Sequence, residues 1–293
     1  MEFNNTMLNS TSIFKTGKKI TNILPKKLGN SLRFRFLAQI NATGKILSEV
    51  HSGVFLELDL SNWLHRLYYL GFVEQNTFKI IKKLLPVDGV FVDIGANIGI
   101  YSCIMAHHVG VKGSIIAFEP MPENLEALYS NIALNQLKNI EVNELALSNS
   151  EKSFNLYVPL AHSQGATGCT QVWNPGDWVS VGTTNATTLD TTFQKQRLDF
   201  IKIDTQGHEL EILQGAKSTI ERFQPIILCE VFEENRTKVF DLMKSWNYAI
   251  CRETKDGYLS TSLPSEGWVD VFLIPQDKVE KVITVLSTGK TYE

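Results

Sequence analysis

Acidic side chains stand beside glycine turns at two places in this sequence. Asp93 precedes a turn that contains Gly95 and Gly99, and Asp204 precedes a turn that contains Gly207. Glycine lets a backbone approach a ligand closely, and a nearby carboxylate can bind a cation or accept a proton. Both places therefore predict ligand-binding chemistry.

Each turn is predicted to connect a β-strand to an α-helix. The apolar run 90–92 precedes the first turn, and apolar residues recur at near-helical spacing through 98–109. The run 198–203 precedes the second turn. Free amides at the start of such a helix point toward whatever lies over the turn. The pattern is typical of the start of a nucleotide-binding α/β domain, although an isolated turn is also an ordinary strand–helix connection.

A third carboxylate narrows the type of nucleotide. The apolar run 114–118 ends in Glu119-Pro120, twenty residues after the first turn, where an acidic residue normally binds ribose hydroxyls. The middle and last glycines of the dinucleotide fingerprint are replaced by Asn97 and Ile100, so a pyrophosphate would be poorly bound.

The carboxylate of Asp93 also argues against phosphate and in favour of a cation. It would repel a phosphate group but suit the amino group of a methionine moiety. S-adenosylmethionine has a ribose, an adenine and no phosphate. The predicted cofactor is therefore S-adenosylmethionine, bound by the residues at the two turns and the neighbouring strand ends: Asp93, Gly95, Asn97, Gly99, Glu119, Pro120, Ala146 and Asp204.

The alternation of helices and strands continues after Glu119. A helix is predicted over 122–136 and a third strand over 140–147, whose end should lie beside the adenine, with main-chain contact from Ala146 or Leu147 preferred to a side-chain contact from Glu144. Short strands at 153–158 and 179–188 flank a loop, 161–178, that has no helical period. This insertion, about 151–188, is the predicted place of substrate recognition.

The second half of the domain is predicted to complete the sheet. Strands are expected at 198–203, 225–231, 248–250 and 269–274, with a helix over 239–246. The last two strands are expected to pair antiparallel. The strands before the two glycine turns should be neighbours at the switch point of the sheet, which would place Asp204 near the transferable part of the cofactor.

Composition agrees with an enzyme of one large or two modest domains. The chain has 293 residues, 43% hydrophobic and 20% charged, with no long apolar run and no apolar leader, so a cytoplasmic protein without a transmembrane segment is expected. The four cysteines are dispersed and are read as reduced and structural.

Three regions are predicted along the chain: a basic extension, 1–50; a cofactor-covering segment, 51–88; and a main domain, 89–293. The extension has eight basic residues and no acidic residue between positions 3 and 48. It could contact an anionic partner or serve as a transit peptide. We favour a solvent-exposed N-terminal segment whose apolar residues around 32–40 pack against the main domain. The covering segment has a predicted strand at 54–60 and helices at 63–69 and 76–85.

The motifs resemble those of the FkbM-type S-adenosylmethionine-dependent methyltransferases. The similar parts are 92–99, the Phe118-Glu119-Pro120 run, and Lys202-Ile203-Asp204 with Gly207 and Glu209, over a span from about 53 to 274. The resemblance implies a class I, Rossmann-like methyltransferase fold with seven mostly parallel strands, and O-methylation of a hydroxyl on a sugar or secondary metabolite. This family often has Glu where this chain has Gln206.

A sugar hydroxyl is a weak nucleophile and gains from a general base. Asp204 is the first candidate, followed by His208 and then Glu230, with His162 in the insertion loop as a more distant one. Asp204, His208 and Glu230 could alternatively hold a divalent cation, but nothing in their spacing indicates ligation, so no metal is predicted. Glu209 could act in the site or simply complement the helix dipole.

Two other classes of function remain open. A nicotinamide-dependent oxidoreductase would share the first turn and Glu119, but Asn97 and Ile100 disfavour it. A scaffold that binds the cofactor without turnover would share every motif. The expected partner is a small-molecule or glycan hydroxyl acceptor rather than a nucleic acid, and the oligomeric state is left open.

Overall fold

The computed structural model describes residues 10–23, 32, 40, 42–159, 178–254, 256–263 and 269–288. The described residues form two compact units, which divide between Val73 and Glu74. The predicted recognition loop, 161–178 with His162, lies outside the described residues apart from Trp178, as do residues 33–39 of the predicted docking segment. In the part of the chain that the structure describes, no helix is long and apolar enough to span a membrane.

The described residues of the first unit form helices and a β-hairpin. These elements are α1 (Ser10–Ile23), β1 (Lys45–His51), β2 (Val54–Asp59) and α3 (Trp63–Leu70), with β1 and β2 antiparallel. Asn62 caps α3 by accepting hydrogen bonds from the amides of Leu64 and His65. The strand β2 and helix α3 confirm the sequence prediction, whereas α1 and β1 were not predicted.

A small core accounts for the unpredicted helix α1. Phe14 is fully buried with Ala42, Leu60 and Leu70, and its ring stacks on Tyr69 at a centroid distance of 5.4 Å. The partner residues of Phe14 are distant in the sequence, so local periodicity carries little signal for this helix. The predicted role of 51–88 as a cofactor cover stays a prediction, because this segment is divided between the two units.

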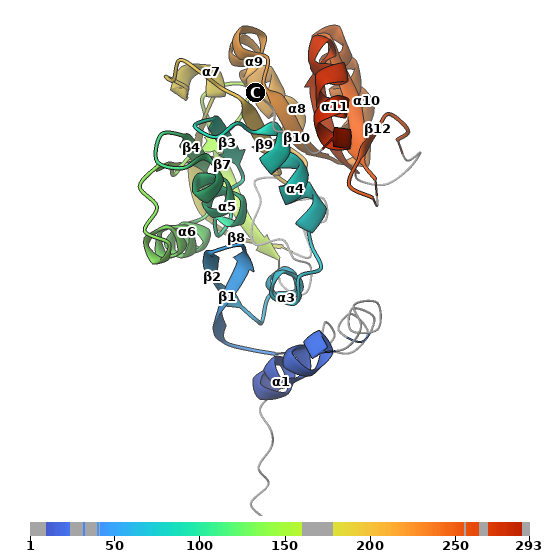
Figure 1. Cartoon of the computed structure of the whole chain (residues 1–293). Helices are drawn as coiled ribbons and strands as arrows, with labels where there is room; N and C mark the ends of the chain where they lie inside the picture. The colour runs from blue at the N-terminus through green and yellow to red at the C-terminus, as the bar shows by residue number, and fades with distance from the viewer. Residues whose placement is uncertain are drawn as a thin grey trace, which may run out of the picture. The chain divides into compact units, whose positions relative to one another are not determined.

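The second unit is built on one eight-stranded mixed sheet, in the order β12-β11-β13-β10-β9-β3-β4-β5. The strands are β3 (Val90–Ile94), β4 (Ser114–Phe118), β5 (Ile140–Asn143), β9 (Phe200–Ile203), β10 (Ile226–Val231), β11 (Tyr248–Glu253), β12 (Leu259–Ser260) and β13 (Val269–Pro275). The five strands from β5 to β10 are parallel, and β13 runs antiparallel between β10 and β11. This is the α/β fold of class I methyltransferases, extended by the short β12. The predicted β3–β9 pairing is confirmed (Figure 1). The predicted antiparallel β11–β13 pairing is also confirmed.

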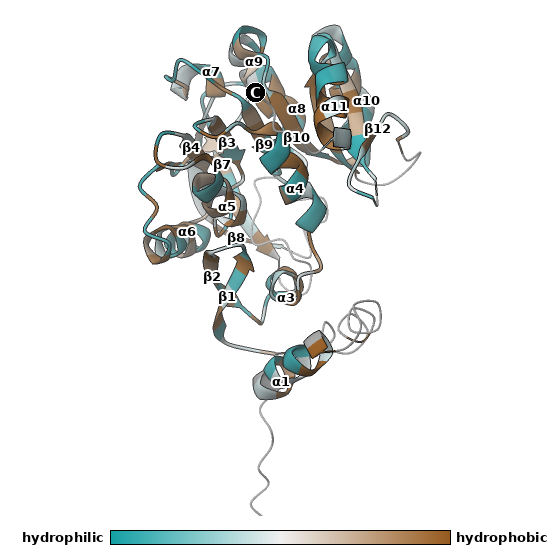
Figure 2. Ribbon diagram, viewed as in Figure 1, coloured by the Kyte–Doolittle hydropathy of each residue, from teal (hydrophilic) through white to brown (hydrophobic). Residues whose placement is uncertain are grey.

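Helices cover both faces of this sheet. They are α4 (Gln75–Leu84), α5 (Ile100–Val109), α6 (Pro122–Leu134), α7 (Leu189–Thr192), α8 (Glu209–Gly215), α9 (Lys217–Phe223), α10 (Glu233–Ser245) and α11 (Val279–Thr288), with a 3₁₀ turn η4 (Gln276–Lys278). Apolar residues of α8, α9 and α10 pack against one face of the strands, and α5 and α6 pack against the other. Figure 2 shows hydrophobic residues concentrated in the strands, as this packing requires.

The predicted third strand, 140–147, is wrong in its second half. The strand β5 ends at Asn143, whose carbonyl accepts the amide of Glu119. The following β6 (Ala146–Leu147) belongs to a separate three-stranded sheet, in which β8 (Trp178–Thr187) lies between β6 and β7 (Lys152–Pro159). Ala146 and Leu147 are buried in this separate sheet, so apolar residues follow the break as they precede it, and hydrophobicity alone does not reveal it.

The helix predicted over 239–246 is also longer than expected. It begins at Glu233, because Glu233 and Glu234 occupy its first turn, where acidic residues favour the helix dipole. Val239, Phe240 and Met243 are its buried residues and were the source of the periodic signal.

Candidate functional site

The turn after β3 is held by the ends of the two neighbouring strands. The amides of Gly95 and Ala96 both donate to the carbonyl of Phe118 at the end of β4, each at 3.0 Å. Gly95 has φ 77°, and a Cβ placed on it would lie 2.0 Å from the carbonyl oxygen of Asp204. Only glycine therefore fits between β4 and the residue that follows β9.

The rest of the turn is also left-handed. Asn97 has φ 53° and Gly99 has φ 87°, and Gly99 precedes the first residue of α5. The side chain of Asn97 accepts a hydrogen bond from the amide of Ile98 at 2.7 Å, a local bond that Asn makes readily in this conformation. An asparagine at this place thus meets the conformational demand that the dinucleotide fingerprint meets with glycine.

Glu119 follows β4 and faces the turn. One carboxylate oxygen accepts the amide of Asn97 at 2.7 Å, and the other accepts the amide of Met121 at 2.9 Å and the side chain of Asn124 at 3.1 Å. Glu119 is 4% exposed, and burial raises the pKa of its carboxyl although these donors oppose the rise. Pro120 follows it and is half-buried. The structure thus places Glu119 beside the glycine turn.

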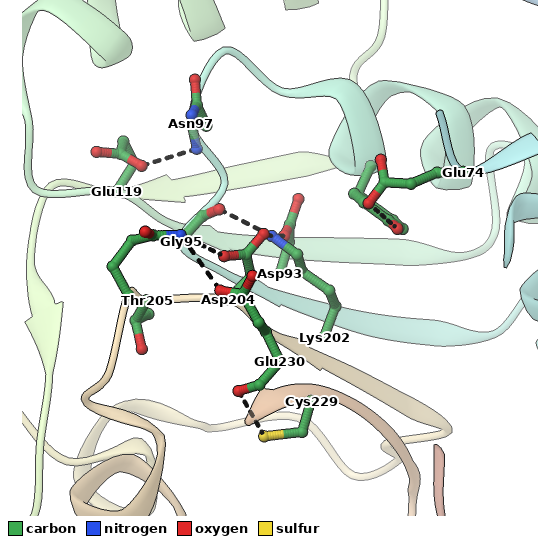
Figure 3. Close-up of polar contacts among 12 residues, drawn as sticks. Glu74, Asp93, Gly95, Asn97, Glu119, Lys202, Asp204, Thr205, Cys229 and Glu230 are labelled. Carbon is green, nitrogen blue, oxygen red and sulfur yellow. Dashed lines mark hydrogen bonds and ion pairs between the residues drawn. The ribbon is translucent and has the colours of Figure 1, made fainter. Parts of the chain in front are cut away.

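Lys202 joins the two turns in the centre of the sheet (Figure 3). Its ammonium group donates to the carbonyl of Gly95 at 3.0 Å and lies 3.6 Å from Asp93 and 3.4 Å from Asp204. Burial opposes its charge, but the carboxylates of Asp204, Asp93 and Glu74 outweigh burial and raise the pKa of Lys202. Lys202 was not among the predicted site residues. A lysine within an otherwise apolar strand was the available signal, because a buried charge needs a partner.

Asp93 lies beneath the turn and has no exposed surface. It accepts a hydrogen bond from Ser102 of α5 at 2.6 Å, in addition to its ion pair with Lys202. Burial raises the pKa of Asp93, and Lys202 and Ser102 oppose this rise. The carboxylate supports the turn through Lys202, which itself binds Gly95.

Asp204 and Glu230 form a carboxyl pair at the ends of β9 and β10. Burial opposes ionisation of Asp204, but Lys202, the hydrogen bond with Glu230 and the amide of Gln206 together lower its pKa. Burial, followed by the charge of Asp204, raises the pKa of Glu230 to about 10. The two pKa values therefore shift in opposite directions, and Asp204 is the member of the pair that favours the ionised form. The side chain of Asp204 is 39% exposed, so a ligand can reach it.

Gln206 lies between these two groups and was not among the predicted site residues. Its amide donates to Asp204 at 3.4 Å and to Glu230 at 3.2 Å, from a left-handed backbone conformation with φ 58°. A glutamate here would place a third carboxyl against the pair. The exchange of Glu for Gln in the family motif was the signal for this residue.

His208 does not join the pair of Asp204 and Glu230. Its Nε2 is 2.9 Å from the hydroxyl of Ser148, its Nδ1 is 3.7 Å from Glu211, and its ring meets Phe154 edge to face. Burial lowers the pKa of His208. Both ring nitrogens thus face protein groups. The role of His208 as a general base stays a prediction, and these contacts do not add support to it.

Glu209 has a structural place in the second turn. It is fully buried, and one carboxyl oxygen accepts the amide of Gly207 at 2.8 Å and the hydroxyl of Thr205 at 3.3 Å. Burial raises the pKa of Glu209 to about 7. The contacts hold the turn that carries Asp204 and Gln206.

The predicted adenine-binding position lies at the end of β5. Ala146 is buried in the separate sheet, and the side chain of Glu144 accepts a hydrogen bond from Tyr129 at 2.8 Å. The side-chain amide of Asn143 is buried and donates to none of the described residues. An unsatisfied donor next to Glu119 fits a ligand with acceptor atoms, such as the ring nitrogens of adenine.

Among the described residues, no group of three or more His, Cys, Asp or Glu side chains is arranged to hold a metal ion. The local cation of this site is the ammonium of Lys202. The arrangement suits a cofactor bound over the Gly95 turn and an acceptor near Asp204.

Comparison with known proteins identifies the family. Residues 93–253, more than half of the chain, match the methyltransferase FkbM domain. The chain is 27% identical over 156 residues to the hexuronic acid methyltransferase AglP of Haloferax volcanii, a match that covers 53% of this chain and 61% of that protein. It is 24% identical over 200 residues to the methyltransferase sdnD of Sordaria araneosa, covering 58% and 77% of the two chains.

A solved FkbM methyltransferase from Methylobacillus flagellatus KT superimposes with a TM-score of 0.43 at 17% identity, covering 71% of this chain and 54% of that one. A superposition at this level adds nothing to the sequence match. The match to the domain spans both glycine turns, Glu119 and the carboxyl pair, and on that ground the chain belongs to the methyltransferase FkbM domain family.

Proposed function

We propose that this protein transfers the methyl group of S-adenosylmethionine to a hydroxyl oxygen of a sugar or secondary metabolite. The observation that carries the proposal is the contact between the two turns: the partly exposed carboxylate of Asp204 follows β9 directly beside the Gly95 turn. The relative named for hexuronic acid supports a sugar as the acceptor class.

The proposed cofactor site uses the edge formed by β3, β4 and β5. Glu119 would accept hydrogen bonds from the ribose hydroxyls, and the backbone from Gly95 to Gly99 would lie against the cofactor. Asn143 and the main chain at Ala146 would contact the adenine. Asp93 is a positioning residue in this proposal, because its carboxylate reaches the turn through Lys202 rather than by its own exposed surface.

S-adenosylmethionine supplies a methyl group on a sulfonium, an electrophile that needs no further activation. The acceptor oxygen would form a bond to the methyl carbon while the carbon–sulfur bond breaks with its electrons moving to sulfur. Asp204 would accept the hydroxyl proton, whose acidity rises as the oxygen becomes bonded to carbon. Alignment of the acceptor supplies much of the rate in such a displacement.

The cofactor proposal predicts a specific effect of Glu119→Gln. S-adenosylhomocysteine should raise the melting temperature of the wild-type protein, and NAD should not. Glu119→Gln should weaken the affinity for S-adenosylhomocysteine about tenfold or more, because a charged acceptor for the ribose hydroxyls is lost. Isothermal titration at 25 °C measures this affinity on the folded variant.

Glu126→Gln serves as the matched control, since Glu126 is an exposed carboxylate on the neighbouring helix α6. Its affinity should equal that of the wild type. Stabilisation by NAD without stabilisation by S-adenosylhomocysteine would overturn the proposed cofactor. Equal affinities of the Glu119 and Glu126 variants would remove Glu119 from the ribose site.

The position of Gln206 predicts a change in pH dependence. Asp204 must be ionised to accept a proton, so activity should fall as the pH decreases through its pKa. Gln206→Glu replaces a donor with a carboxyl and should raise the pKa of Asp204, which moves the acidic limb of the kcat profile to higher pH.

Gln206→Met removes the hydrogen-bond donor without adding a carboxyl. It should therefore move the acidic limb less than Gln206→Glu does. Because the pKa of Asp204 is lowered, rates are measured from about pH 3 to pH 8 with saturating cofactor, so that the acidic limb is included. Coinciding profiles for the wild type and Gln206→Glu would show that Gln206 does not influence the base.

A further inference from the structure

A cavity of about 250 Å³ lies on the same sheet face as the carboxyl pair, toward β11. Its wall comes from α4 and from the strands β10, β13 and β11, and includes Thr77, Leu228, Arg252, Glu253, Asp270 and Phe272. This volume lies below the range of about 300–1,000 Å³ that holds drug-sized ligands. It suits a ligand of the size of one sugar ring.

Strand register connects this cavity to the proposed reaction site. Glu230 of β10 is paired directly with Asp270 of β13, and Leu228 with Phe272, so these four side chains share one face of the sheet. On β9, Lys202 is paired with Leu228 and therefore lies on this face too. Burial, followed by the charge of Asp204, raises the pKa of Asp270.

The polar groups of the cavity can bind hydroxyls. Glu253 is fixed by the hydroxyl of Thr77, which donates to it at 2.6 Å. Asp270 makes no hydrogen bond or ion pair with any described residue, so its carboxylate is available to a ligand. Leu228 and Phe272 provide an apolar floor, and Phe272 is held by the edge-to-face contact of its ring with Phe200 at 6.4 Å. Carboxylates over an apolar floor are complementary to a polyhydroxylated ring, which has hydroxyls at its rim and C–H groups on its face.

The charges of the cavity select among such rings. Arg252 is the one cation in its described wall, and its guanidinium already donates to the carbonyl of Ser262. Glu253 and Asp270 are in the wall itself, and Asp204 is near. A further carboxylate on the ligand would be repelled here.

We propose that this cavity binds the methyl acceptor, and that the acceptor is an uncharged sugar ring whose hydroxyls donate to Asp270 and Glu253. Asp270 in the cavity wall is paired with Glu230, so the edge of a ring bound beside Asp270 would face the carboxyl pair. This inference rests on the proposed methyl transfer, and it narrows the acceptor from sugars in general to uncharged ones.

The test uses methyl β-D-glucopyranoside and the corresponding glucuronide as probes, with the full chain and saturating S-adenosylhomocysteine. Ligand-observed NMR titration measures the affinity for each probe. The wild type should bind the neutral glycoside more tightly than the glucuronide. Glu253→Gln and Asp270→Asn should each weaken binding of the neutral glycoside about tenfold, because each replaces a charged acceptor with an amide.

Glu280→Gln is the control, since Glu280 is an exposed carboxylate of α11 outside the cavity wall. It should bind the glycoside as the wild type does, and all four proteins should bind S-adenosylhomocysteine equally. Tighter binding of the glucuronide, no binding of the neutral glycoside, or equal binding by the wild type and both cavity variants would overturn the inference. A wild-type protein that binds the glycoside but not S-adenosylhomocysteine would instead contradict the proposed function. The cavity would then remain a sugar-binding site without a role in methyl transfer.

Discussion

Replacing Asp204 by asparagine is expected to lower kcat for methyl transfer by about 10²–10⁴-fold, the usual contribution of a general base. The substitution keeps the size of the side chain but removes the group that accepts the hydroxyl proton. The affinity for S-adenosylmethionine should change little, because Glu119 and the Gly95 backbone, which would bind the cofactor, are unaltered. Steady-state kinetics and isothermal titration on the same preparation measure the two effects separately.

A stability control is needed for this variant, because Asp204 also pairs with the buried Lys202. Asp199→Asn provides it: Asp199 stands at the opposite end of the same strand and binds the amide of Val90 at 2.8 Å. That variant should lose stability without losing turnover once folded. Turnover in Asp204→Asn equal to that of the wild type would remove Asp204 from the mechanism.

Gly95→Ala is expected to destabilise the second unit by about 2–5 kcal/mol. A left-handed non-glycine residue costs roughly 1–2 kcal/mol, and overpacking costs about 1–3 kcal/mol more. The overpacking is severe here because the new Cβ would lie 2.0 Å from the carbonyl oxygen of Asp204, which belongs to the backbone and cannot rotate away. The turn and Asp204 must then separate, so binding of S-adenosylhomocysteine should also weaken. Urea denaturation monitored by circular dichroism measures the stability.

Gly71→Ala distinguishes the steric effect from the conformational one. Gly71 is left-handed with φ 75°, similar to Gly95, but nothing lies within 4 Å of the position of its Cβ. Its substitution should therefore cost only about 1–2 kcal/mol. Equal losses in the two variants would contradict the close contact between the two turns.

Local patterns in the sequence were sufficient for most of the sheet. Strand β3 is a short apolar run that ends in a glycine turn, and β4 is a similar run that ends at Glu119. Their side-chain period and turn residues are properties of consecutive residues. The adjacency of β3 and β9 also followed from the sequence, because the switch point of a doubly wound sheet is a general rule.

The same rules gave a wrong assignment where the local sequence pattern fits more than one sheet. Ala146 and Leu147 were assigned to the third strand, yet they pair with β8. Both residues are buried in the sheet that they do join, and their partner strand is about forty residues further along the chain. Hydrophobic periodicity does not report such a distant pairing.

The sequence by itself determined the family, the central strand order and the presence of acidic residues at the ends of β3, β4 and β9. Only the tertiary structure decided how these residues are partnered. Lys202 links Asp93, Gly95 and Asp204, while His208 faces Ser148 instead of the carboxyl pair. The register of β10 against β13 aligns Asp270 with Glu230 and opens a cavity beside them. The physical reason is that charge pairing, hydrogen bonding and register depend on contacts between distant segments, whereas the strand and turn patterns arise from neighbours in the chain.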